Sequence, residues 1–180
     1  MRVTGAVLSL EQKQMLASMG VLLLHIQTLE TIIRFCVTYV FHNKPSFSIE
    51  ILKTQEKHIR NKTIGYLLHE LRQRVGISDD FERVLNDFLQ MRNMFVHNVD
   101  EIPGWSLYSN EGLLAAWSFV NKFFQKIETV QAVFFGLIRS WQEEVGMPPE
   151  LGITNTSEQY FSMIDRIYKP LVGDIFFEKE

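Results

Sequence analysis

The chain has 180 residues, of which 46% are apolar and 22% are charged, with only 10 glycines and 5 prolines. This composition excludes disorder and collagen-like repeats, and it suits one domain with a core of its own. The net charge of −3 excludes a broadly basic nucleic-acid-binding surface, so any such contact would be local.

The few prolines leave long blocks of sequence in which apolar residues recur every three or four positions, as in helices. The first block predicts a helix from Ser9, where Ser9 and Gln12 can form a capping box, to about Phe41. At 1.5 Å per residue such a helix is about 50 Å long. Gly20 is a point at which it can divide into two segments.

The middle of the chain predicts a loop at 42–47, a helix around 48–60 and a helix at 63–75 that Gly76 stops. A further helix starts at Ser78, with acidic residues in its first turn, and runs to about Asn98. Its expected core stripe is Phe81, Val84, Leu85, Phe88, Met91 and Phe95.

After a loop at 100–110, the pattern predicts a second very long helix at 111–145. A Gly/Pro loop at 146–155 precedes a short helix at 158–168, and the tail docks or frays. No segment predicts a strand. The expected buried stripe of the long helix is Leu114, Trp117, Val120, Phe124, Ile127, Val130, Phe134, Leu137 and Trp141.

These elements predict an all-α fold, an elongated antiparallel helical bundle of four main helices plus a short C-terminal helix. We expect one domain over 1–180 with its core at about 8–145. The two longest helices leave apolar surface for a partner, so we expect a homodimer.

The sequence lacks signs of disulfide bonds, of a secretory signal and of a membrane span, so we expect a cytoplasmic protein. Cys36 is the single cysteine, which excludes an internal disulfide and a zinc site of the usual spacing. The first residues lack the pattern of a secretory signal. Polar residues such as Glu30 and Arg34 interrupt the apolar region at 15–41, which argues against a membrane span.

One motif stands out, because metal-ligand spacings, paired carboxylates and Gly-rich phosphate loops are absent from the sequence. Arg92 and Asn93 are adjacent, and His97 follows four residues after Asn93. This combination arises by chance in about one sequence in a hundred of this composition. We therefore expect no cofactor and no metal, and take these residues as the candidate site.

With Ile64, Gly65, Leu67 and Leu71 on the preceding helix and an acidic turn between, the motif resembles the HEPN superfamily. The resemblance covers about 8–145, and its specific part is the few residues around the motif. It implies a metal-independent endoribonuclease, a toxin or phage-defence component with an antitoxin or defence partner, whose active site forms where two motifs meet in a dimer. Arg92 and His97 would be the catalytic pair and Asn93 a polar supporter.

The residue types suit that chemistry. Histidine, with an unperturbed pKa near 6.5, can take a proton from an RNA 2′-hydroxyl or give one to the leaving oxygen. The guanidinium of arginine can donate two hydrogen bonds to phosphate oxygens and stabilises the negative charge that develops on them. Five helical steps, however, place Arg92 and His97 about 140° apart and about 7.5 Å along the axis. Either Arg92 curls round the helix, or two chains assemble the site.

The sequence departs from the family at Val99, where toxins that pair with a nucleotidyltransferase carry a tyrosine that the antitoxin modifies. The resemblance therefore does not imply that form of control. Basic residues outnumber acidic ones in one stretch of the sequence, and we take five of them as candidate RNA contacts. The competing interpretation is that they form a solvent-exposed face of a helix. These residues are Lys57, Arg60, Lys62, Arg72 and Arg74.

Simpler interpretations compete with the catalytic one. Arg92 can be a surface residue, and His97 can interact with the last carbonyls of its helix. Asp87 can orient Arg92 or lie free on the surface, and Glu30 can pair with Arg34 one turn away. The alternative function is a non-catalytic helical bundle that binds a partner protein or RNA.

Overall fold

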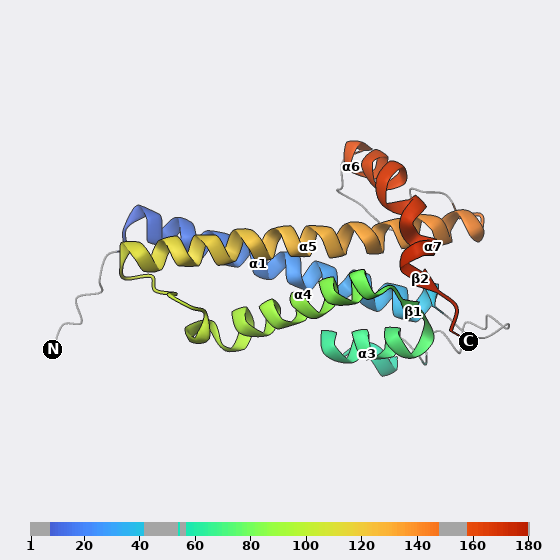
Figure 1. Ribbon diagram of the computed structural model, residues 1–180, viewed down its shortest axis with the longest axis horizontal. Coiled ribbons are helices and arrows are strands. Elements are labelled where there is room, and N and C mark those ends of the chain that lie inside the picture. Colours follow the sequence, from blue (N-terminus) through green and yellow to red (C-terminus); the bar gives the residue numbers. More distant parts are fainter. Residues whose placement is uncertain (1–7, 42–53, 55–56, 148–157, 180) are drawn as a thin grey trace.

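The computed structural model describes residues 8–41, 54, 57–147 and 158–179, which form an elongated all-α bundle with one short strand pair (Figure 1). The predicted loop at 42–47, most of the helix around 48–60 and most of the loop at 146–155 lie outside the described residues. Within these ranges, four long helices make up the bundle: α1 (Leu10–Phe35), α3 (Ile64–Arg74), α4 (Asp79–His97) and α5 (Asn110–Glu144).

The predicted capping box at the start of α1 is confirmed. The backbone N–H of Gln12 donates to Oγ of Ser9 (3.2 Å), and the backbone N–H of Ser9 donates to Oε1 of Gln12 (2.7 Å). The helix runs through Gly20 without a break and continues as a π-helical turn at Cys36–Val40. The first block is therefore one helical rod.

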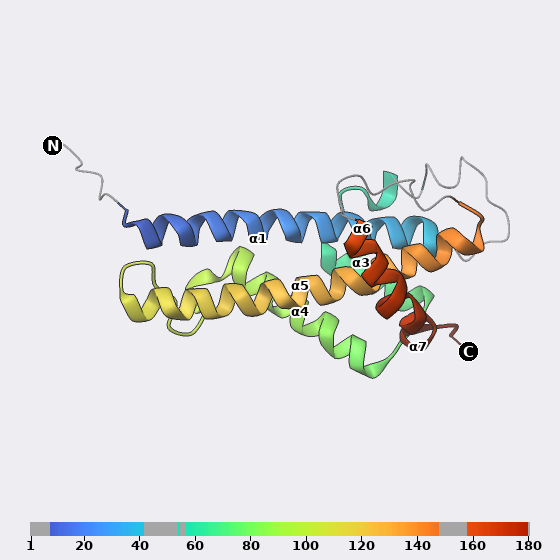
Figure 2. The same ribbon diagram turned by 90° about the horizontal axis from the view of Figure 1, so that it is seen from above.

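The two longest helices run parallel, which corrects the predicted antiparallel arrangement for this pair. Near the start of α1, the side chain of Gln12 donates to the Leu107 carbonyl just before α5 (2.7 Å). Near the end of α1, the ring of Phe35 lies 5.8 Å from the ring of Trp141, near the end of α5. The residue numbers of the contacting pairs therefore increase together along both helices. The chain returns to its starting end through α4, which runs opposite to both (Figures 1 and 2). Because a whole helix intervenes, α5 can start where α1 starts.

The expected stop at Gly76 has a different cause from the one predicted. Its backbone lies in the two-residue strand β1 (Gly76–Ile77), antiparallel to β2 (Phe176–Phe177). A Cβ at Gly76 would lie 2.2 Å from the ring of Phe177. The glycine therefore makes room for the docked tail, and the expectation of no strand is wrong at this one pair.

The C-terminal segment packs across the end of α5 (Figure 1). The predicted short helix is α6 (Glu158–Met163) with a π-helical turn at Ile164–Tyr168. A 3-10 turn (Lys169–Leu171) and α7 (Val172–Ile175) then lead to β2. Arg139 on α5 holds this segment by a paired contact with Asp165, at 2.8 and 2.6 Å.

The core follows the predicted apolar stripes, but at several positions of α5 the buried residue is a neighbour of the predicted one, as two pairs illustrate. Leu113 is 8% exposed and Leu114 is 70% exposed, so the prediction that Leu114 is buried is wrong. Likewise Phe123 is fully buried, and Phe124 is only partly buried beside the ring of His25. A stripe assigned at three- and four-residue steps fits either neighbour, and only the packing of α4 and α1 selects one.

The first helix is also long and apolar enough to cross a membrane, by length and composition alone. Over Leu10–Val40 the mean hydropathy of an 18-residue window reaches 1.5, with 28% of that window buried in the fold. The remaining residues of this apolar window are half-buried or exposed.

Candidate functional site

The motif residues lie at the end of α4, and Arg92 reaches His97 within one chain. Nη1 of Arg92 lies 3.0 Å from Nε2 of His97, and it also donates to Oδ1 of Asn93 at 3.2 Å. The long arginine side chain curls round the helix, which removes the 140° separation. Of the two predicted arrangements, the curled one is present in the structure.

The contact between Arg92 and His97 sets the roles of the imidazole nitrogens. Arginine has only donors, so in this contact Nε2 of His97 is the acceptor, which leaves Nδ1 as the nitrogen that carries the imidazole proton. An accepting Nε2 is the atom that a general base needs. His97 and Asn93 are both exposed, so this side of the site is open to a ligand.

A third group, Glu30 of α1, completes the cluster. Nη2 of Arg92 donates to Oε1 of Glu30 at 3.2 Å, and both side chains are largely buried. Glu30 thus pairs across the bundle and not with Arg34, as the sequence spacing had suggested. Asp87, the residue considered for orienting Arg92, pairs with Lys126 at 3.0 Å.

Sequence reasoning missed the partnership of Glu30 and Arg92 because 62 positions separate them. One local signal was present. Glu30 follows the buried Leu29 directly and stands three positions before the buried Ile33, which places a charge at the margin of the core stripe. A charge in that position needs a partner on the neighbouring helix.

An apolar groove lies between α1 and α4. Its lining is Met19, Gly20 and Leu23 of α1 with Phe95 and Val96 of α4, around a volume of about 320 Å³. Val96 is one turn beyond Arg92 on α4, and Leu23 is two turns before Glu30 on α1, so the groove lies farther along the same pair of helices than the ion pair.

Large apolar side chains continue the exposed surface along α1. We call this surface the α1 face and define it as Leu16, Val21, Leu23, Leu24 and, from α4, Val96, each of which is at least one-third exposed.

The predicted RNA contacts divide into two groups. Arg72 pairs with Glu82 (2.6 Å), and Arg74 pairs with Glu70 (3.1 Å), so carboxylates already neutralise these two arginines.

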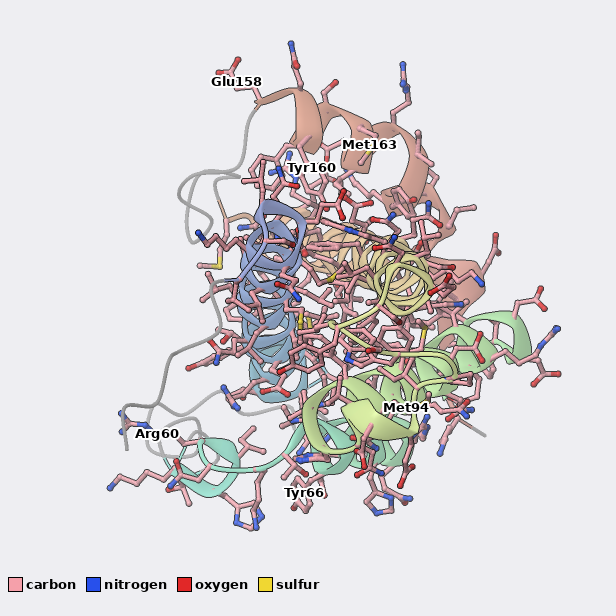
Figure 3. The ribbon with its side chains drawn as sticks, turned by 90° about the vertical axis from the view of Figure 1, so that its left-hand side faces the viewer. Arg60, Tyr66, Met94, Glu158, Tyr160 and Met163 are labelled. Carbon is pink, nitrogen blue, oxygen red and sulfur yellow. The ribbon has the colours of Figure 1, made fainter. Side chains whose placement is uncertain are left out.

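The other three cations lie near the start of α3. Lys57 and Arg60 are exposed, and Lys62 lies over the ring of Tyr66, 4.8 Å from its centroid. Figure 3 looks along the bundle and shows Arg60 well apart from Met94, which lies between Arg92 and His97 on α4. The five cations therefore do not form one patch around the motif.

Within the described ranges, no three His, Cys, Asp or Glu side chains gather as a set that could hold a metal ion. No protein-family model, curated protein or solved structure matches this chain. The contacts of Arg92, His97 and Glu30 therefore carry the functional argument.

Proposed function

We propose that this protein is a metal-independent endoribonuclease of the HEPN type, acting as a homodimer in a cytoplasmic toxin or phage-defence setting. The observation that supports this most is the 3.0 Å contact between Arg92 and His97 at the exposed end of α4. It brings a permanent cation and an accepting imidazole nitrogen together where RNA can reach both.

The proposed reaction is internal transesterification. Nε2 of His97 takes the proton of an RNA 2′-hydroxyl as its oxygen attacks the adjacent phosphorus. The bond from phosphorus to the 5′-oxygen breaks, and that oxygen takes a proton from the His97 of the second copy, which holds a proton on Nε2 when it is released from its own Arg92. Arg92 stabilises the negative charge that builds on the phosphoryl oxygens. The products are a 2′,3′-cyclic phosphate and a 5′-hydroxyl, with no metal in any step.

The α1 face supports the dimer in this proposal. Large apolar side chains on a protein surface often mark sites of protein–protein or membrane interaction. A two-fold axis beside α1 and α4 would cover this face and bring the Arg92 of each copy toward the other. Leu24→Glu, at a residue 62% exposed, should dissociate the dimer. Leu114→Glu, at a residue 70% exposed on α5, is the matched control and should not.

The measurement for the dimer is molar mass by light scattering at several protein concentrations, with vesicle flotation beside it. A monomer at every concentration would contradict the dimer. Flotation of the wild type that Leu24→Glu abolishes would show that a membrane covers the α1 face instead.

The test of cleavage compares wild type with His97→Ala and Arg92→Ala on labelled RNA in excess EDTA. Each substitution should lower the rate at least about 100-fold, and wild-type products should end in cyclic phosphate. Arg83→Ala is the control, because Arg83 is an exposed arginine of the same helix that pairs with Asp80. Cleavage that survives His97→Ala would contradict the proposed chemistry.

The second candidate function is a non-catalytic bundle that binds a partner protein or RNA. The ion pair of Glu30 with Arg92 favours it, because that pair also ties α1 to α4 and gives Arg92 a structural role. Under this alternative, folded dimeric wild type leaves RNA intact, and Arg92→Ala lowers the free energy of unfolding or weakens association.

RNA binding itself is proposed to rest on the exposed cations Lys57 and Arg60, with Lys62 beside them. Replacing Lys57 and Arg60 with alanine should weaken binding and flatten its dependence on salt, since fewer phosphates are then neutralised. Arg72→Ala should change the salt dependence less, because Glu82 already pairs with that arginine.

A further inference from the structure

The guanidinium of Arg92 is held by three side chains that differ in exposure. Nη1 uses both of its hydrogens, one on Asn93 Oδ1 and one on His97 Nε2. Nη2 donates to Oε1 of Glu30. The buried Nε has no hydrogen-bond partner among the described residues. Asn93 and His97 thus accept from Nη1, and Glu30 accepts from Nη2.

The two ends face different surroundings. Asn93 and His97 are exposed, whereas the side chains of Arg92 and Glu30 are 16% and 22% exposed. A phosphate group can therefore approach Nη1 only from the side of His97 and Asn93. When it does, Nη1 must exchange one of those neutral acceptors for a phosphate oxygen, and Nη2 can stay on Glu30 throughout.

A carboxylate at this position does what a neutral acceptor would not. It balances the arginine charge in a partly buried place, where an unpaired charge is costly. It also restricts a side chain that otherwise loses much rotamer freedom on binding a ligand. The arginine is then already aimed at the substrate side before RNA arrives.

We infer that Glu30 is the positioning residue of the site. It anchors Nη2 of Arg92 from α1, so that Nη1 is free to pass from His97 to the scissile phosphate. The inference rests on the proposed ribonuclease function. It adds a residue to that function from outside the Arg-Asn-x-x-x-His motif.

The test is steady-state cleavage of labelled RNA by Glu30→Gln, which keeps the side-chain size and an accepting oxygen but removes the charge. We expect kcat to fall about 10- to 100-fold, as for a misplaced catalytic group, with KM nearly unchanged. In an Arg92→Lys background the same substitution should cause no further loss, because the arginine through which Glu30 acts is already gone.

Asp165→Asn is the matched control for losing a partly buried ion pair. It removes the partner of Arg139, whose side chain is also 16% exposed, from the far end of the bundle. Its kcat should equal that of wild type. Unfolding midpoints of both variants are measured beside the kinetics, so that a loss of fold is not read as a loss of positioning.

The outcomes separate this inference from the proposed function. Full kcat in Glu30→Gln, or an equal further loss in the Arg92→Lys background, would overturn the positioning role while cleavage dependent on His97 stands. A variant that unfolds where Asp165→Asn does not would make Glu30 a structural residue and would also overturn the role. Intact RNA with wild-type protein would remove the ribonuclease function, and the role of Glu30 with it.

Discussion

Two glycines in the first turns of helices should respond with opposite sign to the same substitution. Gly112 is the third residue of α5, after the cap Ser109, and Gly65 is the second residue of α3, after the cap Thr63. A Cβ at Gly112 would lie 2.3 Å from Cβ of Ser106, whereas at Gly65 the nearest such atom is Oγ1 of Thr63, at 4.0 Å. There is no room for a side chain at Gly112, whereas a Cβ fits at Gly65 without a close contact.

The crowding at Gly112 cannot be relieved by a rotamer change. The carbonyl oxygen and Cα of Ser106 would also lie at 2.6 and 2.8 Å from the new Cβ, so backbone must move. That loop carries Oγ of Ser109, which accepts from the N–H of Gly112 (3.1 Å), and the Leu107 carbonyl, which accepts from Gln12 (2.7 Å). Moving it therefore weakens both the cap of α5 and its tie to α1.

The magnitudes follow from these contacts. Overpacking costs about 1–3 kcal/mol, a lost cap costs about 1 kcal/mol, and the better helix propensity of alanine returns up to about 1 kcal/mol. Gly112→Ala should thus lower the free energy of unfolding by about 2 kcal/mol, or the Tm by about 4–8 °C. Gly65→Ala should raise it by about 0.5 kcal/mol, or about 1–2 °C, since alanine restricts the unfolded chain.

The assay is urea unfolding followed by circular dichroism, with thermal melts of wild type and both variants at one protein concentration. A Gly112→Ala protein as stable as wild type would refute the close approach of the loop to α5. A destabilised Gly65→Ala would refute the open surroundings of that glycine.

Three further predictions concern the core and one ion pair. The pKa of Asp165 lies below its ordinary value of 3.8, first because Arg139 donates hydrogen bonds to its carboxylate. The ionised carboxylate therefore stabilises the folded protein at pH values above 3.8. That stabilisation is lost as the pH falls through the lowered pKa of the folded protein. Asp165→Asn should accordingly flatten the acid side of the stability curve measured by urea unfolding between pH 2 and 5. Burial raises the pKa of the Cys36 thiol, so a thiol reagent should label it only in denaturant, and rapid labelling of folded protein would contradict its burial. Phe123→Ala should cost about 3–5 kcal/mol of unfolding free energy and Phe124→Ala less, because only Phe123 is fully buried; equal losses would contradict that difference.

Much of the local structure was predictable from the sequence. The capping box of Ser9 and Gln12, the start of α4 after Ser78 and the formation of a short helix at 158 all depend on neighbours within a few positions. The place of the motif at the end of an amphipathic helix was predictable for the same reason.

The register of α5 was less predictable. Leu113 and Leu114 fit the same helical stripe within one residue, and so do Phe123 and Phe124. Which of each pair faces inward depends on how α5 is rotated against α4 and α1. Periodicity fixes the spacing of a stripe and leaves that rotation open by up to one step of about 100°.

By itself the sequence determined that the chain is helical, where α1 with its π-helical turn, α3, α4 and α5 begin and end to within a residue or two, and that Arg92 and His97 lie five residues apart on one of them. Only the tertiary structure decided that α1 and α5 run parallel, that Arg92 curls onto His97, and that Glu30 anchors it. The physical reason is the distance along the chain between the interacting residues. Helix caps and helical turns form between residues at most four positions apart, so a local sequence predicts them. A charged residue at the margin of the core pairs with a residue of whichever helix packs beside it, which only the tertiary structure determines.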